Sequence, residues 1–272
     1  PSEMRLVLEG GVLTFLNGAV DIGQGSSTVL AQVVAEALGL PVAALREVNG
    51  DTARTPDAGK TSASRQTFVS GRAALEAALD LRRQVNGALG WDGARVTVNG
   101  APWQGPALHG QGRFDPPTVP LDGAGQGVPY ATYGFAAQLC ALSVDTELGT
   151  VALERFVAAH DVGRAVNPTL VEGQVHGGIA QGIGLALMEE YIPGRTENLH
   201  DYLIPTAGDV PPIEVILVED PEPLGPFGAK GVGEPALVAT APAILSAIRD
   251  ATGASIRRLP ALPHRVLEAL DG

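Results

Sequence analysis

Hydrophobic and polar positions along this chain follow the same order of patterns twice. Each time, two alternating stretches come first, followed by a helical repeat, a short apolar stretch and a second helical repeat. Alternation is typical of half-buried strands, whereas apolar residues three and four apart are typical of helices that pack on a core. In the first half this predicts a hairpin over residues 4–8 and 12–16, a helix over 29–38, a strand over 45–48 and a helix over 68–89, with a further short strand over 95–98.

The second half predicts a hairpin over residues 133–144 and 151–160, a helix over 168–190, a strand over 213–218 and a helix over 235–252. Residues 101–129, between the two patterns, are rich in Gly, Pro and Gln and only weakly periodic, so we expect a long loop or a subdomain junction there. The repeated order predicts an α+β fold of two similar lobes, residues 1–125 and 126–272, in which helices pack on mixed sheets.

Composition and charge exclude several classes of protein. A hydrophobic content of 45% and a charged content of 18% are those of a globular chain. The net charge of −12 argues against a nucleic-acid partner and against an anionic membrane surface, because both require clustered Lys and Arg. The longest charge-free run, between Asp122 and Asp145, is interrupted by Gly, Gln and Pro, so we expect no membrane span. The chain begins at Pro1 directly in strand-like sequence, which suggests a missing upstream portion.

Cysteine and histidine usage points to a reduced protein without a side-chain metal site. The single cysteine, Cys140, excludes an internal disulfide and favours a reducing compartment, so we expect a cytoplasmic protein. It lies in an apolar strand, where a buried structural thiol is expected rather than a nucleophile. The five histidines are scattered, and no spacing among them is that of a metal site.

A glycine-dense loop near the C-terminus, Gly228-Ala229-Lys230-Gly231-Val232-Gly233, delivers Glu234 to the start of a helix. Glycines let a ligand approach the backbone closely, because no Cβ is in the way. A carboxylate held there can act as a general base if its surroundings shape its proton affinity. It can equally well only complement the helix dipole. The pattern alone leaves both interpretations open.

Two polar loops stand in front of predicted helices. Residues 21–28, Asp-Ile-Gly-Gln-Gly-Ser-Ser-Thr, offer backbone and side-chain donors to an anion, or Ser26 or Ser27 only caps the helix. The third glycine of a dinucleotide fingerprint is absent. Residues 61–67, Thr-Ser-Ala-Ser-Arg-Gln-Thr, carry more hydroxyls and amides than one cap needs, so a polar or phosphate-like ligand and a solvated loop are equal alternatives.

The helix over residues 173–184 is unusually rich in glycine. Each glycine inside a helix costs roughly 1 kcal/mol relative to alanine. Close approach of another backbone, or of a large flat ligand, would account for them. Gln181 can donate and accept with its amide, whereas His176 is expected to be a structural histidine.

Together these segments resemble the molybdenum hydroxylases of the xanthine dehydrogenase and aldehyde oxidoreductase type. The resemblance covers nearly the whole chain and corresponds to the C-terminal half of the family's molybdopterin-binding subunit. Each match is weak alone, but seven occur in the family's order. They are Gly23-Gln24-Gly25, Gly50-Asp51-Thr52, Thr61-Ser62-Ala63-Ser64-Arg65, Asp161 to Pro168, Glu172 to Gly182, Tyr202 to Thr206 and Gly228 to Glu234.

The resemblance implies a role for each matched position. Glu234 would be the catalytic base beside molybdenum, and Gln24 the hydrogen-bond partner of the metal centre. The metal would be held by the pterin dithiolene and not by protein ligands, and bacterial relatives often carry the molybdopterin as the cytosine dinucleotide. In some relatives a serine stands in place of Gln66. The implied cofactor-binding residues are Ile22, Gly23, Gln24, Gly25, Thr61, Ala63, Ser64, Arg65, Gln66, Gln181 and Lys230.

The implied activity is oxidation of an aldehyde or a purine-like N-heterocycle with water as the oxygen source, at a cofactor between the two lobes. Large subunits of the family carry a preceding half with further pterin contacts, which this chain does not contain. The resemblance therefore implies a hetero-oligomer whose partners are that N-terminal molybdopterin half, an iron–sulfur subunit and an FAD subunit. Two alternatives stay open. One is a cofactor-free fragment or assembly module that retains the fold, and the other is a nucleotide-binding α/β protein, which the absence of a P-loop lysine disfavours.

Overall fold

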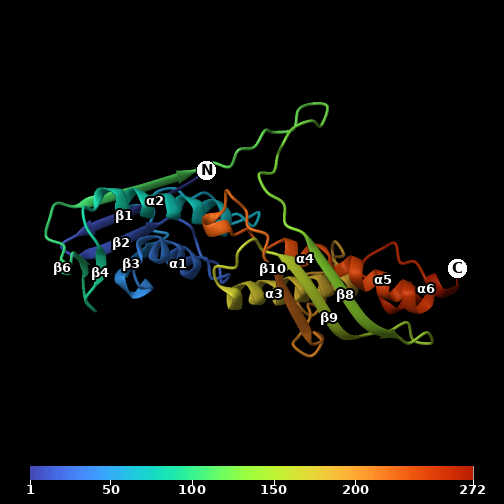
Figure 1. The fold of residues 1–272 in the computed structure, drawn as a ribbon. Coiled ribbons are helices and arrows are strands. Elements are labelled where there is room, and N and C mark those ends of the chain that lie inside the picture. The colour runs from blue at the N-terminus through green and yellow to red at the C-terminus, as the bar shows by residue number, and fades with distance from the viewer. Residues whose placement is uncertain (272) are drawn as a thin grey trace. The chain divides into compact units, whose positions relative to one another are not determined.

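The computed structural model describes residues 1–271, which form two compact units (Figure 1). Unit 1 consists of Pro1–Tyr133, Val162–Asn167 and Glu219–Gly231. Unit 2 consists of Gly134–Asp161, Pro168–Val218 and the chain from Val232 onward. These units differ from the predicted lobes of residues 1–125 and 126–272, because two segments of the second half pack with the first.

The main sheet of unit 1 has the strand order β3-β2-β1-β7. Met4, Leu6 and Leu8 of β1 are buried, whereas Glu3 and Arg5 between them are exposed, so one face of the sheet is covered and the other is not. β2 runs antiparallel to β1 and parallel to β3, as expected for a hairpin followed by a crossover. The strands are β1 (Ser2–Glu9), β2 (Val12–Asn17), β3 (Leu45–Asn49) and β7 (Leu108–Phe114).

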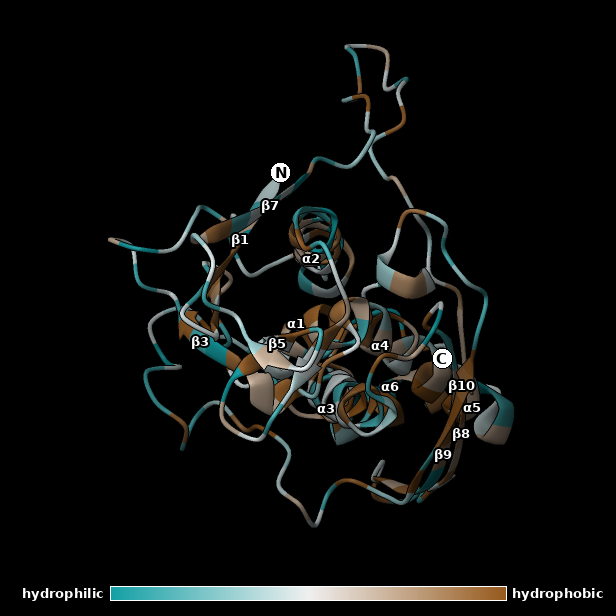
Figure 2. Ribbon diagram, turned by 60° about the vertical axis from the view of Figure 1, so that its left-hand side comes forward, coloured by the Kyte–Doolittle hydropathy of each residue, from teal (hydrophilic) through white to brown (hydrophobic). Residues whose placement is uncertain are grey.

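Two helices form the core of unit 1 with the inner face of this sheet. In Figure 2, α2 is hydrophobic along one side and hydrophilic along the other.

The helix predicted over residues 68–89 ends earlier, because Leu89 begins a strand of a small second sheet. The remaining elements of unit 1 are α1 (Ser26–Leu38), η1 (Val42–Ala44), the π-helical turn η2 (Gln66–Ser70), α2 (Gly71–Gln84), β4 (Leu89–Trp91), β5 (Val96–Val98), β6 (Ala101–Pro102) and η3 (Pro226–Gly228).

The prediction of a loop over residues 101–129 is wrong in its first part, because β7 is an edge strand paired with β1. Gly110 and Gly112 of β7 face α2. A Cβ on Gly110 would lie 2.7 Å from the Leu81 Cβ, and one on Gly112 would collide with the Ala73 carbonyl oxygen. Glycine thus lets the helix lie directly on the strand, and it also removes the hydrophobic alternation that identifies a strand in sequence.

The rest of that segment, residues 115–133, forms a hairpin arm, drawn in green in Figure 1. Val119 pairs with Val128, and the Asp122 carboxylate closes the turn by accepting the N–H groups of Ala124 and Gln126 at 2.8 and 2.9 Å. The apolar side chains of the arm are more than half exposed. They are Val119, Leu121, Val128, Tyr130 and Tyr133.

Unit 2 repeats the pattern of unit 1 with a sheet of order β10-β9-β8, in which β8 and β9 are antiparallel and β9 and β10 parallel. The helix predicted over residues 235–252 is interrupted at Ala239, and a final helix was not predicted. The helix predicted to Glu190 ends at Leu187. The elements are β8 (Ala136–Val144), β9 (Val151–Asp161), α3 (Pro168–Leu187), β10 (Ile213–Val218), α4 (Pro235–Val238), α5 (Thr240–Thr252) and α6 (Pro263–Asp271).

Among residues 1–271, no helix has both the length and the apolar character needed to cross a membrane. Cys140 is buried on β8, as expected for a structural thiol, and burial raises its pKa to about 11.

Candidate functional site

The residues that the resemblance singles out lie in both units. Unit 1 contains the loop after β2, the loop before η2 and the end of the glycine-dense loop. Unit 2 contains Gln181 on α3 and Glu234 at the start of α4. The positions in unit 1 are Ile22, Gly23, Gln24, Gly25, Thr61, Ala63, Ser64, Arg65, Gln66 and Lys230.

The backbone donors of the loop after β2 are occupied by a residue of the same loop. Asp21 accepts the N–H groups of Gly23 at 2.8 Å, Gly25 at 3.3 Å and Ser27 at 3.0 Å. Burial acts to raise the pKa of Asp21, but these hydrogen bonds outweigh it and hold the pKa below its usual value. The Asp21 carboxylate thus occupies the backbone donors that the sequence offered as one of two alternatives to an external anion. The helix N-cap is Gly25, and not Ser26 or Ser27.

Gln24 is turned back on its own loop. Its Oε1 accepts the Ile22 N–H at 2.7 Å, and its Nε2 donates to the Ser26 hydroxyl at 2.9 Å. The side chain of Ile22 beside it is 73% exposed. A hydrogen bond from the Gln24 amide to a ligand would therefore replace one of these two local bonds.

The loop before η2 has backbone strain at two consecutive residues. Ala63 and Ser64 have positive φ angles of 55° and 50°, which non-glycine residues adopt at a cost of about 1–3 kcal/mol each. The surrounding side chains hold this conformation. The Thr61 hydroxyl donates to the Val20 carbonyl at 2.7 Å, and the buried Gln66 donates to Thr61 at 2.9 Å. Strain supported in this way is a common feature of ligand-binding loops.

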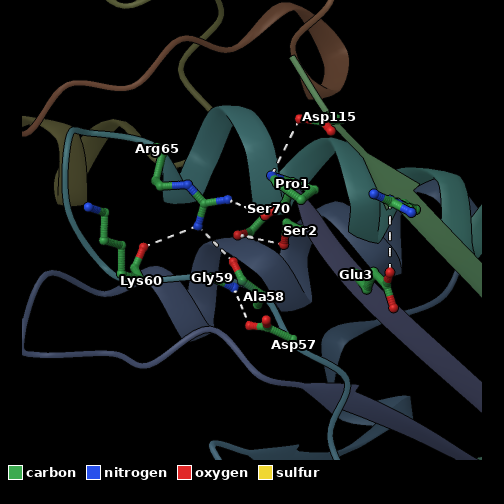
Figure 3. A network of polar contacts seen from close by, with 11 residues as sticks. Pro1, Ser2, Glu3, Asp57, Ala58, Gly59, Lys60, Arg65, Ser70 and Asp115 are labelled. Atoms are coloured by element: carbon green, nitrogen blue, oxygen red, sulfur yellow. Dashed lines mark hydrogen bonds and ion pairs between the residues drawn. The ribbon is translucent and has the colours of Figure 1, made fainter.

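Arg65 fixes the same loop from the other side (Figure 3). Its guanidinium donates to the carbonyl oxygens of Ala58 at 2.7 Å, Lys60 at 3.1 Å and Pro1 at 2.7 Å. Burial lowers the pKa of Arg65, and the nearby Asp57 opposes that shift. The guanidinium thus binds backbone of the same unit, which makes Arg65 a residue that positions the loop.

Lys230 and Gly231 bring the glycine-dense loop against the strained loop. A Cβ on Gly231 would collide with the Ser64 carbonyl oxygen, so only glycine allows this approach. Lys230 is 7% exposed, donates its N–H to the Val162 carbonyl at 2.9 Å and forms an ion pair with Asp220 at 3.6 Å. Three sequence-predicted segments of unit 1 are therefore neighbours in space.

In unit 2, some glycines of α3 face α4 and α5, and others lie on the open side of the helix. A Cβ on Gly178 would lie 2.6 Å from the Ala236 Cβ, and one on Gly182 would collide with Thr240, so these glycines admit α4 and α5. A Cβ on Gly173 or Gly177 would meet nothing within 4 Å. Gln181 lies on the exposed side of the helix, as does His176, which was expected to be a structural histidine.

Glu234 is the residue that precedes α4, with helical backbone angles and an exposed side chain. Pro235 follows at the first helical position, where its lack of an N–H has no cost. The residues of this chain therefore do not by themselves provide a poorly hydrated setting for the Glu234 carboxylate. Any exclusion of water there must come from a ligand or a partner.

The sequence did not identify the residues that hold these loops. Asp21 was recognised only as part of a polar loop, although the Asx pattern, in which a carboxylate accepts N–H groups a few residues later, is a known signal. Asn17, at the end of β2, is completely buried and accepts the Ala19 N–H at 2.8 Å. Its Nδ2 has no partner among the described residues.

Comparison with known proteins places the chain in a family. Residues 2–211 match the molybdopterin cofactor-binding domain, and the chain belongs to that family. It is 34% identical to the putative xanthine dehydrogenase molybdenum-binding subunit XdhA of Escherichia coli, over 97% of this chain and 38% of that subunit. It is 33% identical to the 6-hydroxypseudooxynicotine dehydrogenase complex subunit gamma of Paenarthrobacter nicotinovorans, over 98% of this chain and 37% of that subunit.

The fold agrees with that of solved structures. The aldehyde oxidoreductase from Desulfovibrio desulfuricans superposes with a TM-score of 0.88 at 34% identity, over 98% of this chain and 30% of that enzyme. The prediction of an α+β cofactor-binding fold is thereby confirmed. The chain spans little more than a third of the length of the curated relatives it matches.

The residues present fit a molybdopterin. Gly231 and the strained turn at Ala63 and Ser64 form a close backbone approach that a Cβ would obstruct. The surrounding side chains are mostly neutral hydroxyls and amides, which suit a heterocycle with many donors and acceptors. Among residues 1–271, no group of three or more His, Cys, Asp or Glu side chains could hold a metal ion.

Proposed function

We propose that this chain is the molybdopterin-binding portion of a molybdenum hydroxylase that oxidises an aldehyde or a purine-like N-heterocycle with water as the oxygen source. The main support is that family-matched loops far apart in sequence are neighbours in unit 1. Thr61 bonds to Val20 beside the Gln24 loop, and Gly231 packs on Ser64. The names of relatives, a xanthine dehydrogenase subunit and an aldehyde oxidoreductase, favour this substrate range.

In this proposal each loop has a separate task. Ala63, Ser64 and Gly231 provide the surface on which the pterin lies, while Thr61, Arg65 and Gln66 keep that surface in shape. Gln24 exchanges a local hydrogen bond for one to the metal centre. The exposed amide of Gln181 contacts the pterin from α3, and the positive charge of the mostly buried Lys230 favours an anionic part of the cofactor.

Glu234 is the proton acceptor of the proposed reaction. When bound, the molybdenum cofactor supplies the centre that takes up two electrons from the substrate. The net change converts a substrate C–H into C–OH with oxygen from water, and it releases two protons and two electrons. The Glu234 carboxylate oxygen accepts the proton that the water-derived oxygen loses as it forms the new C–O bond.

The proposed partners are the preceding molybdopterin half, an iron–sulfur subunit that takes up the electrons and an FAD subunit. Two observations support assembly with other polypeptides. A relative is by name a subunit of a dehydrogenase complex. The hairpin arm also exposes five large apolar side chains. Because an isolated two-stranded hairpin is only marginally stable in water, contact with another polypeptide would stabilise the arm. We propose a cytoplasmic location, because a chain whose single cysteine, Cys140, cannot form an internal disulfide is suited to a reducing compartment.

The test is the cofactor content of the complete protein, purified with its partner polypeptides. We expect about one molybdenum and one pterin per chain in the wild type. Replacement of Gly231 by Val, which would displace the Ser64 backbone, should reduce both in parallel, whereas Gly208→Val, where an added Cβ meets only the Thr206 hydroxyl at 3.8 Å, should leave both unchanged. A complete complex without molybdenum or pterin would instead indicate an assembly module that retains only the fold.

A further inference from the structure

A polar cluster in unit 2, made of the half-buried Gln138 and the buried His160 and Thr240, contacts the residues that follow Glu234. Gln138 of β8 is at its centre. Its Nε2 donates to the Ala236 carbonyl oxygen at 2.8 Å, and its Oε1 accepts the Thr240 hydroxyl at 2.8 Å. The Nε2 also lies 3.2 Å from Nε2 of His160 on β9. His160 and Thr240 are 1% and 0% exposed.

The orientation of this cluster is determined by its partners. The Ala236 carbonyl can only accept, so the Gln138 amide nitrogen must face it, and the amide oxygen must face the Thr240 hydroxyl. The second N–H of Gln138 then points to His160, which accepts at Nε2 and carries its proton on Nδ1. Burial lowers the pKa of His160, which favours this neutral form. Nδ1 of His160 has no partner among the described residues.

Helix α3 also packs closely against the residues that follow Glu234. Gly178 approaches Ala236, and Gly182 approaches Thr240, so closely that a Cβ on either would clash. The start of α4 is thereby held between a glycine surface on α3 and the Gln138 amide on β8. Half-burying a glutamine in a largely apolar strand would be costly without hydrogen-bond partners, and Ala236, Thr240 and His160 provide them.

Glu234 belongs to the turn that is held in this way. Its φ of −71° and ψ of −37° are helical, and its carbonyl accepts the Leu237 N–H at 3.0 Å. Ala236 is only two residues further on. The boundary of unit 2 falls at Val232, so this turn is where the chain becomes fixed after it enters the unit. Whatever fixes Ala236 therefore limits the position of the Glu234 backbone.

We propose that Gln138, supported by His160 and Thr240, is a positioning residue that sets where the Glu234 carboxylate stands. This inference rests on the proposed function of Glu234 and extends it to Gln138, which lies about a hundred positions earlier in the chain. Gln138 acts through the Ala236 carbonyl and touches neither substrate nor cofactor.

The test uses the complete complex with Gln138→Met, which keeps the size of the side chain and removes its hydrogen bonds. Amide exchange over residues 234–240, followed by mass spectrometry, should accelerate about tenfold, because each opening of the turn becomes easier. Molybdenum and pterin content should stay at the wild-type value. The kcat should fall by between about tenfold and a hundredfold with little change in KM, as for a displaced catalytic group. Gln111→Met on β7, whose side chain is exposed, is the matched control.

A double variant distinguishes an effect that acts through Glu234 from a nonspecific loss of activity. The rate of a single turnover is compared for Gln138→Met in the wild-type background and in the Glu234→Gln background. If Gln138 acts through Glu234, it should lower the rate by less than about twofold once the carboxylate is gone. An equal loss in both backgrounds, or unchanged amide exchange over residues 234–240, would overturn the proposal. Full activity of Glu234→Gln alone would instead refute the base assignment on which the proposal rests.

A milder variant covers the case in which Gln138→Met does not fold. Thr240→Val keeps the shape of the side chain and removes the donor to the Gln138 Oε1, together with the longer contact of the hydroxyl with the Ala236 carbonyl oxygen at 3.4 Å. The same exchange experiment should then show a smaller acceleration confined to residues 234–240. A change spread evenly over β8, α3 and α5 would mean that the cluster only stabilises the unit, and would overturn the positioning role.

Discussion

Units 1 and 2 share a hairpin, a crossover helix and a parallel strand, but they hold their site residues by different means. In unit 1, strained loops are kept in place by individual hydrogen bonds from Asp21, Thr61 and Arg65. In unit 2, Glu234 starts a helix that is fixed by glycine-mediated packing and one amide side chain. Apart from the close contact of Gly231 with Ser64, the site loops of unit 1 should therefore be sensitive mainly to lost donors and acceptors, and unit 2 mainly to added volume.

The outer faces of the two sheets differ as well. In unit 1 the face without helices carries charged and polar side chains, among them Glu3, Arg5 and Arg113. In unit 2 the corresponding face is largely apolar, with Leu139 at 61% exposure and Ile216 and Val218 each at 45%. A face of this kind is typical of a surface that another protein covers. The shared topology therefore does not imply a shared environment.

The largest effect on stability is expected from added volume in unit 2. Gly182→Val would force α3 away from Thr240, and we expect a loss of about 3 kcal/mol in the free energy of unfolding. Gly177→Ala, one turn away on the open side of the same helix, should stabilise by about 0.5–1 kcal/mol. Urea denaturation of both variants measures this contrast. Equal effects of the two substitutions would show that α3 does not depend on glycine at Gly182.

A somewhat smaller effect is expected from a lost donor in unit 1. Arg65→Met leaves three backbone carbonyl groups without their charged donor, and we expect a loss of about 2 kcal/mol. Arg46→Met, on the exposed side of β3, should change stability by less than about 0.5 kcal/mol. The two variants are compared by the same denaturation experiment. If they behave alike, the loop is held by something other than the guanidinium.

The loop after β2 should respond to pH through Asp21. Because the folded-state pKa of Asp21 lies below its usual value, its contribution is complete above the unfolded pKa of about 4 and is lost as pH falls through the folded value. Amide exchange of Gly23, Gly25 and Ser27 should therefore become less protected, after correction for the intrinsic rate, only below about pH 4. Asp21→Ala, which removes the acceptors of all three N–H groups, should show the reduced protection already at neutral pH. Protection that is independent of pH in the wild type would contradict this role of Asp21.

The last prediction concerns the reactivity of the Cys140 thiol, for which no change in stability is involved. With its pKa raised to about 11 by burial, the thiol should be almost entirely protonated at pH 8. Labelling by a disulfide reagent should be roughly a hundredfold slower in the folded chain than in urea. Rapid labelling of the folded chain would show that β8 opens readily or is accessible at this position.

Periodicity was sufficient to predict the elements that pack through side chains. The hairpins, α1, β3, β10 and the α+β class are recognisable because their apolar residues recur at regular spacing. β7 was missed because it packs through Gly110 and Gly112, which leave no hydrophobic signal. The break at Ala239 was missed because tertiary packing determines it. The final helix α6 does carry a local signal, Pro263 at its start and the apolar residues Val266, Leu267 and Leu270 on one face, which was not used.

The site was predicted only as far as local motifs extend. The loops containing Gln24, Ser64 and Glu234 were identified by resemblance, and the unit 1 members were found to be neighbours. The supporting residues were not identified, because their contacts join distant parts of the chain. Gln138 bonds to Ala236 and Thr240, about a hundred residues later, and in sequence it is one polar residue in an apolar strand.

The central claim, that Glu234 is the base of a molybdenum hydroxylase, is tested most directly by Glu234→Gln in the complete complex. Molybdenum and pterin are quantified first, and the rate of reduction by substrate is then measured from pH 5 to 10. We expect full cofactor content and a rate lower by about a hundredfold to ten-thousandfold, the range of general base catalysis. A variant that keeps its cofactor and reacts at near wild-type rates would contradict the account.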